Sequence, residues 1–154
     1  MSCETVPMEL RRLLWFTYLL GAMGMGGELL IMNHTEGAWQ WLPIGLISFS
    51  LLALVAQSIV ASRWLIQGFR FIVLLIFLSA FAGIWLHFDG KAEFKLEMDP
   101  TLKGWDLIWA CIRGHSLPPV FAPGSMMLLG LLGIAWSYKH PSLYRQRKTL
   151  EDGV

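Results

Sequence analysis

The sequence has few charged residues for its length. Charged residues make up 15% of the 154 residues and hydrophobic residues 55%, whereas soluble domains carry about 25% charged residues. This composition excludes an ordinary soluble domain and indicates one integral membrane unit. The net charge of +1 provides no global positive field, so we expect no binding to nucleic acid.

The sequence also lacks motifs that would support an enzyme or a redox protein. It contains no glycine-rich phosphate loop, no GxSxG elbow and no HExxH segment, so we predict a protein without enzymatic activity. Cys3 and Cys111 form no CxxC pair and indicate neither a disulfide nor redox chemistry. The apolar run after Arg11 and Arg12 has no small-residue cleavage site, which favours a retained span over a cleaved signal.

Long apolar runs predict an all-α integral membrane fold with four transmembrane helices. Twenty helical residues cover about 30 Å, the thickness of the hydrocarbon core. The expected spans are residues 13–32, 41–61, 64–86 and 120–138, and the whole chain, 1–154, is expected to form a single membrane domain. Four glycines in the first span would let another helix approach closely, or they reflect only the higher frequency of glycine in membrane helices.

The distribution of Lys and Arg predicts that both termini lie in the cytoplasm. Eight basic residues fall on the side of the termini and four on the other side, and the more basic side is usually cytoplasmic. The larger set is Arg11, Arg12, Arg63, Arg70, Lys139, Arg145, Arg147 and Lys148, and the smaller set is Lys91, Lys95, Lys103 and Arg113. We therefore expect an inner-membrane protein with loops 33–40 and 87–119 outside and the tail 139–154 inside.

The second outer loop, residues 87–119, is expected to form an extracytoplasmic cap with two elements. Charged and apolar residues alternate from Lys91 to Asp99, which predicts an extended segment with one buried face that would need a partner strand. Asp99 and Pro100 then predict the start of an interfacial amphipathic helix of about fourteen residues. Its Trp105 and Trp109 would face lipid or the bundle.

Potential metal ligands collect near the outer membrane face of this topology. Histidine and carboxylate groups suit Zn²⁺ or Cu²⁺. The candidate ligands are His34, Glu36, His87 and His115, and the supporting groups are Gln40, Asp89, Glu93 and Glu97. Because no HxH or HxxxH spacing occurs, the alternative is that these groups are solvated loop residues or helix caps. Haem is not expected, since bis-histidine sites in membrane bundles normally lie within the spans.

Two charged residues lie inside predicted spans. Glu28 would lie about 6 Å below the outer face, where an ionisable side chain usually faces the bundle or a wet cavity. It would then handle protons or cations, or only fix packing through hydrogen bonds. Arg70 would lie about 9 Å inside the opposite face, too far from Glu28 to pair. It would snorkel to the headgroups beside Arg63, hold an anionic lipid, or bind an anionic substrate.

The segments GELLIMNHTEGAWQWLP, EFKLEMDP, LPPVFAPGSMMLLGLLG and KHP follow one another along the chain. This pattern resembles a group of small uncharacterised bacterial four-span inner-membrane proteins, and the resemblance implies no activity. No motif supports a match to the DoxX-like four-span proteins.

Three functions are consistent with these features. The leading one is a small non-enzymatic accessory or structural subunit that docks onto a larger membrane assembly or onto copies of itself. The alternative is a metal-handling or proton/cation-coupled transport component centred on Glu28, His34 and His87. A membrane enzyme acting on lipid or quinone would require a cavity that reaches Glu28 or Arg70 from the bilayer.

Overall fold

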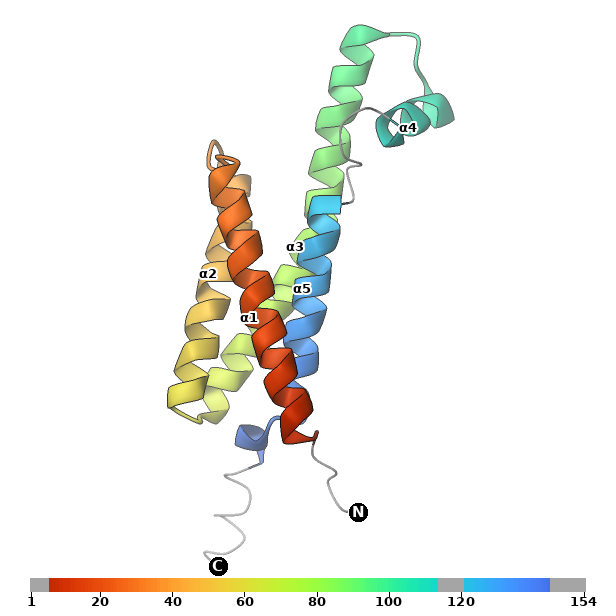
Figure 1. The fold of residues 1–154 in the computed structure, drawn as a ribbon. Helices are drawn as coiled ribbons and strands as arrows, with labels where there is room; N and C mark the ends of the chain where they lie inside the picture. Colours follow the sequence, from red (N-terminus) through yellow and green to blue (C-terminus); the bar gives the residue numbers. More distant parts are fainter. Residues whose placement is uncertain (1–5, 114–120, 145–154) are drawn as a thin grey trace, which may run out of the picture. The chain divides into compact units, whose positions relative to one another are not determined.

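The structure is a computed structural model that describes residues 6–113 and 121–144, and within these residues the protein is all-helical with no strand. The elements in chain order are α1 (Met8–Ile31), α2 (Ala38–Ile59), α3 (Arg63–Met98), α4 (Gly104–Ile112), α5 (Phe121–Ser137) and a short 3-10 helix, η1 (Pro141–Leu143) (Figure 1). The predicted all-α class is confirmed.

Three helices, α1, α2 and α3, are long and apolar enough to cross a membrane. Only 11%, 28% and 17% of the residues in their most apolar stretches are buried inside the protein, so these helices present most of their apolar side chains outward. Such a surface is stable in lipid and costly in water, which supports a membrane protein. The fourth apolar helix, α5, has 17 residues and a length of about 25 Å.

The chain forms two compact units. Unit 1 comprises residues Met1–Ile76 and Leu129–Val154, and unit 2 comprises Phe77–Leu128. Unit 1 therefore contains α1, α2, η1, the first part of α3 and the last part of α5. Unit 2 contains the remainder of α3, α4 and the first part of α5.

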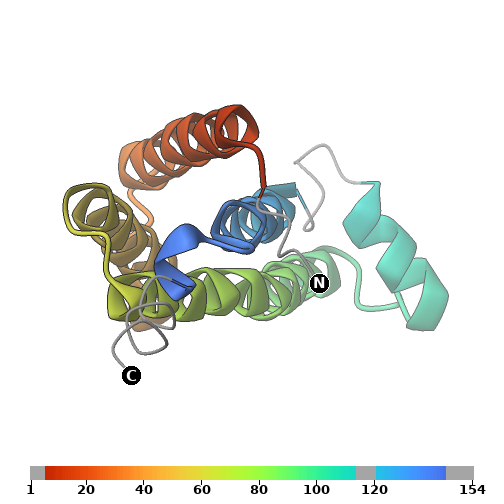
Figure 2. The same ribbon diagram turned by 90° about the horizontal axis from the view of Figure 1, so that it is seen from below.

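The core of unit 1 joins α1, α3 and α5. Ile66, Phe69 and Val73 are fully buried on α3, at the alternating spacing of three and four residues that marks the packed side of a helix. The Phe69 ring meets Tyr18 and Trp136 edge to face, with ring centroids 5.3 and 5.0 Å apart. Such aromatic pairs stabilise a core beyond the area that they bury. Within unit 1, the last part of α5 lies between α1 and the first part of α3 (Figure 2).

Two hydrogen bonds satisfy the buried hydroxyl groups of Tyr18 and Ser50 in unit 1. The Tyr18 hydroxyl donates to Ser50 Oγ over 2.7 Å, and Ser50 Oγ donates to the carbonyl of Ile47 over 2.7 Å. Because a buried polar group without a partner costs about 1–3 kcal/mol, this chain of hydrogen bonds lets α1 and α2 bury polar side chains where they pack.

The predicted extended segment at Lys91–Asp99 is wrong, because α3 continues as one helix to Met98. Of the apolar side chains assigned to one buried face, only Ala92 is buried, whereas Phe94 is 58% and Met98 70% exposed. The segment is rich in Lys, Ala, Glu, Leu and Met, which are strong helix formers. Extending an existing helix also avoids the cost of nucleation, so helix propensity outweighs the alternating pattern.

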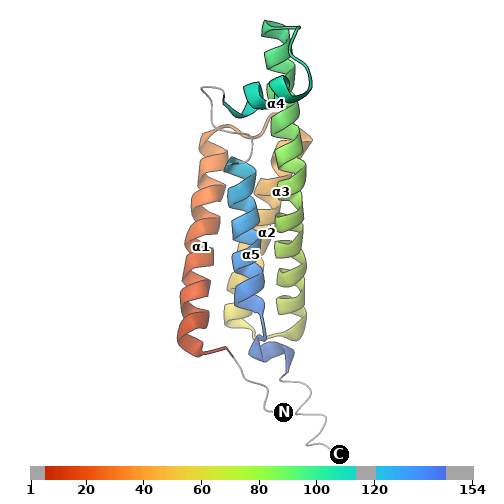
Figure 3. The same ribbon diagram turned by 90° about the vertical axis from the view of Figure 1, so that its right-hand side faces the viewer.

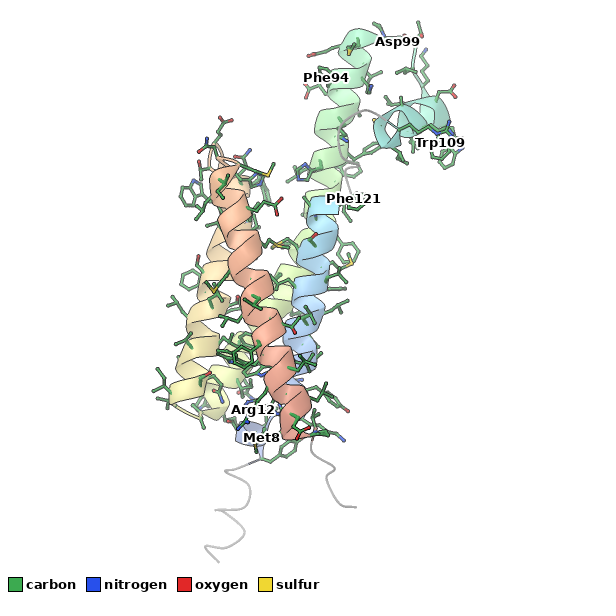
Figure 4. The ribbon with its side chains drawn as sticks, in the orientation of Figure 1. Met8, Arg12, Phe94, Asp99, Trp109 and Phe121 are labelled. Atoms are coloured by element: carbon green, nitrogen blue, oxygen red, sulfur yellow. The ribbon has the colours of Figure 1, made fainter. Side chains whose placement is uncertain are left out.

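The predicted start of the next helix at Asp99 and Pro100 is also wrong. The Asp99 side chain accepts hydrogen bonds from the backbone N–H and the hydroxyl of Thr101, at 3.0 and 2.6 Å, and these bonds lower the pKa of Asp99. The resulting turn follows the end of α3, and the chain then reverses direction (Figure 1). Helix α4 begins only at Gly104 and has nine residues. The labelled Phe94 and Asp99 lie near the end of α3, and Trp109 lies on α4 (Figure 4).

Candidate functional site

The predicted site residues of unit 1 lie on and beside the turn between α1 and α2. His34 and Gln40 are half-buried and Glu36 is exposed. The Glu36 backbone N–H donates to Gln40 Oε1 over 2.7 Å, and Trp41 Nε1 donates to the carbonyl of Thr35 over 3.0 Å. Gln40 therefore ties the start of α2 to the turn, although Gly37, the N-cap of α2, makes no side-chain capping bond.

The predicted site residues of unit 2 lie along α3. His87, Asp89, Glu93 and Glu97 are all exposed. The three acidic residues follow one another at intervals of four, so they form a stripe along one side of the helix. The stripe is about 12 Å long, and it spreads the carboxylates along the helix instead of directing them to one point.

No metal centre is assembled by the residues that the structure describes. Within residues 6–113 and 121–144, no group of three or more His, Cys, Asp or Glu side chains could hold a metal ion. The predicted ligands His34 and Glu36 belong to unit 1 and His87 belongs to unit 2, whereas His115 lies outside the described residues. The Zn²⁺ or Cu²⁺ site and the metal-handling or transport function therefore stay predictions, as does the expectation that no haem binds.

Glu28 is exposed on α1, whereas an ionisable residue at this depth was expected to face the bundle. It shares one side of the helix with a set of residues that we call the open α1 face: Leu20, Gly24, Gly27, Glu28 and Ile31. Nothing lies within 4 Å of the position that a Cβ would take at Gly24 or Gly27. Leu20 and Ile31 are 69% and 84% exposed. Among the described residues of unit 1, none therefore covers this side of α1.

A second polar group of residues, which the sequence analysis missed, lies where α1 begins and α5 ends. Arg11 Nη1 donates to the carbonyl of Trp136 over 2.9 Å, and Nη2 donates to the carbonyl of Lys139 over 3.1 Å. The last carbonyls of a helix lack partners within the helix and carry partial negative charge. Arg11 therefore caps the end of α5. The start of α1 and η1 lie at the same end of unit 1 (Figure 3).

Three more residues complete this group: Gln57, His140 and Ser142. We call these three residues and Arg11 the end cluster. The Ser142 backbone N–H donates to His140 Nδ1 over 3.3 Å, and Gln57 Nε2 donates to Ser142 Oγ over 2.7 Å. Burial, and secondarily the charge of Arg11, lower the pKa of His140 to about 4. His140 is therefore neutral at pH 7 and accepts through Nδ1.

The end cluster fastens helix ends and does not form a nucleophilic pair. An activated serine donates its hydroxyl proton to a neighbouring base. Here His140 Nδ1 accepts from the backbone of Ser142, and the Ser142 hydroxyl accepts from Gln57. His140 Nδ1 is thus occupied by the Ser142 backbone N–H and not by its hydroxyl. No local sequence pattern indicates this arrangement, because Arg11 and Trp136 are 125 residues apart.

No family model, curated protein or solved structure matches the chain. Function is therefore inferred from the residues of this chain alone.

Proposed function

We propose that this chain is a small non-enzymatic integral membrane protein that serves as an accessory or structural subunit. It docks through α1 onto a larger membrane assembly or onto a second copy of itself. The observation that carries the proposal is the open α1 face, on which Glu28 is exposed beside Gly24 and Gly27.

The open α1 face combines two features of a helix contact inside a membrane. Small residues such as Gly24 and Gly27 let a partner backbone approach closely. Glu28 lies one turn from the end of α1, where contact with hydrocarbon is costly for a carboxylate. A partner helix with a hydrogen-bond donor would remove this cost, and exposed Leu20 and Ile31 would add apolar contact.

In this proposal the protein lies in the inner membrane with α5 as a fourth span and both termini in the cytoplasm. Support comes from the eight basic residues on the side of the termini, against four on the other side. The apolar sequence from Val120 to Tyr138 is long enough for a span with little tilt. Helix α4 then lies at the outer surface, where exposed Trp105 and Trp109 suit the lipid headgroup region.

Native mass spectrometry of the full chain, extracted in mild detergent, tests the proposal. We expect the wild type to carry a second copy or a co-purifying membrane protein. The double variant Gly24→Leu/Gly27→Leu should lose this partner, because two leucines keep the opposing backbone at a distance. Gly68→Leu is the matched control, since Gly68 is also exposed, with nothing within 4 Å of its Cβ position.

Two outcomes would contradict this proposal. A wild-type protein that is monomeric without any co-purifying protein would exclude a stable subunit. Equal loss of the partner in the α1 double variant and in Gly68→Leu would show that the open α1 face is not the docking surface. Circular dichroism spectra of all variants should show unchanged helix content, because none of the substituted glycines has a positive φ.

A further inference from the structure

Helix α3 presents two exposed arginines on one side near its start. Arg63 is the first residue of α3 and Arg70 follows seven residues later; both side chains are exposed. Seven residues make almost two full turns, so the two side chains leave the helix in nearly the same direction, about 10 Å apart along its axis. Gln67, which is half-buried, lies between them on the same side.

The same side of α3 becomes apolar deeper in the predicted span. Leu74 follows Arg70 by four residues and is 43% exposed, and the neighbouring Phe71 is 62% exposed. Trp64, at the other end, is 77% exposed, as suits the level of the lipid headgroups. This side of α3 is thus cationic at the membrane edge and apolar inside, which complements the negative headgroup and the acyl chains of an anionic lipid.

Arg63 and Arg70 differ from Arg11 in the partners of their guanidinium groups. The Arg11 guanidinium is held by the carbonyls of Trp136 and Lys139 at 2.9 and 3.1 Å. Within the described parts of the chain, neither Arg63 nor Arg70 is held by a carboxylate. A guanidinium as deep as that of Arg70 is costly unless it reaches the headgroups or an anion accompanies it.

We propose that Arg63, Gln67 and Arg70 bind the phosphate of an anionic phospholipid, whose acyl chains lie along Phe71 and Leu74. Arginine matches phosphate through paired N–H donors, and Gln67 supplies a neutral donor between the two charges. The bound lipid neutralises Arg70 at its depth in the membrane. The proposal is independent of the docking of α1, because it uses a different helix.

Lipid retention by the purified full chain tests this site. The protein in detergent is titrated with phosphatidylglycerol or with phosphatidylcholine, and bound lipid is counted by native mass spectrometry. We expect phosphatidylglycerol to bind more tightly. Its affinity should fall about 5-fold for Arg63→Gln or Arg70→Gln and about 30-fold for the double variant, since each basic residue near an anionic surface contributes about one such factor.

Two variants distinguish lipid binding at this site from non-specific attraction of the lipid to any positively charged residue. Arg12→Gln removes an exposed arginine at the start of α1 (Figure 4) and should change phosphatidylglycerol affinity less than 2-fold. Arg63→Lys/Arg70→Lys should bind more tightly than the double glutamine variant and less tightly than the wild type, because lysine keeps the charge but lacks the paired N–H donors. Partial recovery of this kind shows that the glutamine variants lose charge and not fold. Equal affinity for the two lipids, an equal effect of Arg12→Gln, or displacement of the lipid by 10 mM inorganic phosphate would each overturn the proposal.

Discussion

At the scale of single residues, Gly133 lies at the closest approach of α1, α3 and α5 in unit 1. A Cβ at this position would lie 2.5 Å from Val73 Cγ1 and 2.9 Å from Tyr18 Cε2. Val73 and Tyr18 are both fully buried, so neither side chain has space to move away. Only glycine fits this point, and the spacing of the three helices depends on it.

We therefore expect Gly133→Ala to destabilise the protein. Overpacking a close-packed core costs about 1–3 kcal/mol, which outweighs the gain of up to about 1 kcal/mol in helix propensity. Gly68→Ala is the control, because Gly68 is open and should gain the propensity without a clash. Unfolding in mixed detergent, followed by circular dichroism, measures both changes. A Gly133→Ala protein as stable as Gly68→Ala would contradict the close packing.

The end cluster makes stability depend on pH through His140. Because burial and Arg11 lower its pKa from the ordinary 6.5 to about 4, the unfolded chain binds a proton more readily than the folded chain between these values. The contribution of neutral His140 to the free energy of unfolding is fully present above pH 6.5 and is lost as the pH falls towards 4. The ring is only half-buried, so solvent screening reduces the expected loss to about 1–2 kcal/mol.

The His140→Asn variant isolates this effect from the other titrating groups. Unfolding free energies of wild type and variant are compared at pH 7.5 and pH 4.5. The wild type should lose about 1–2 kcal/mol more than the variant over this interval. Parallel losses in the two proteins would show that His140 titrates normally in the folded state.

At the scale of secondary structure, α3 shows why a sequence pattern can mislead. Alternation at Lys91–Met98 has the period of a strand, but on a helix it produces two charged and two apolar sides. Asp89, Glu93 and Glu97 form the acidic stripe, and Lys91 and Lys95 lie together on another side. The composition favours a helix and no proline occurs from Arg63 to Asp99, so the continuous helix has no local obstacle.

Spin labels at two positions distinguish the helix from the extended segment. Glu93→Cys and Glu97→Cys are introduced on a background without Cys3 and Cys111, since both glutamates are exposed. Four residues span about 6 Å in a helix and about 13 Å in a strand. We expect strong dipolar broadening in the electron paramagnetic resonance spectrum. Broadening no greater than that of the summed single-label spectra would contradict a helix through this segment.

At the scale of the whole molecule, the sequence could predict what depends on local composition. The first three predicted spans overlap α1, α2 and α3, and residues 120–138 overlap α5, because hydrophobic length is a property of each segment. The Tyr18–Ser50 bond and the contacts of Arg11 and Gln57 in the end cluster could not be predicted, because their partners lie 32 to 128 residues apart. For the candidate site, the sequence could predict that Glu28 lies near the end of a helix, but it could not predict that Glu28 lies on the exposed side of that helix.

The contact between Arg11 and the end of α5 also has a consequence in time. A ribosome adds about 5–20 residues per second, and 125 residues separate Arg11 from Trp136. Roughly 6–25 s therefore pass between the synthesis of Arg11 and the synthesis of the carbonyls that it caps. Until then its guanidinium lacks both of these carbonyl partners. Closure of the end cluster therefore requires synthesis to have passed Lys139 for the Arg11 contacts and Ser142 for the contact with Gln57.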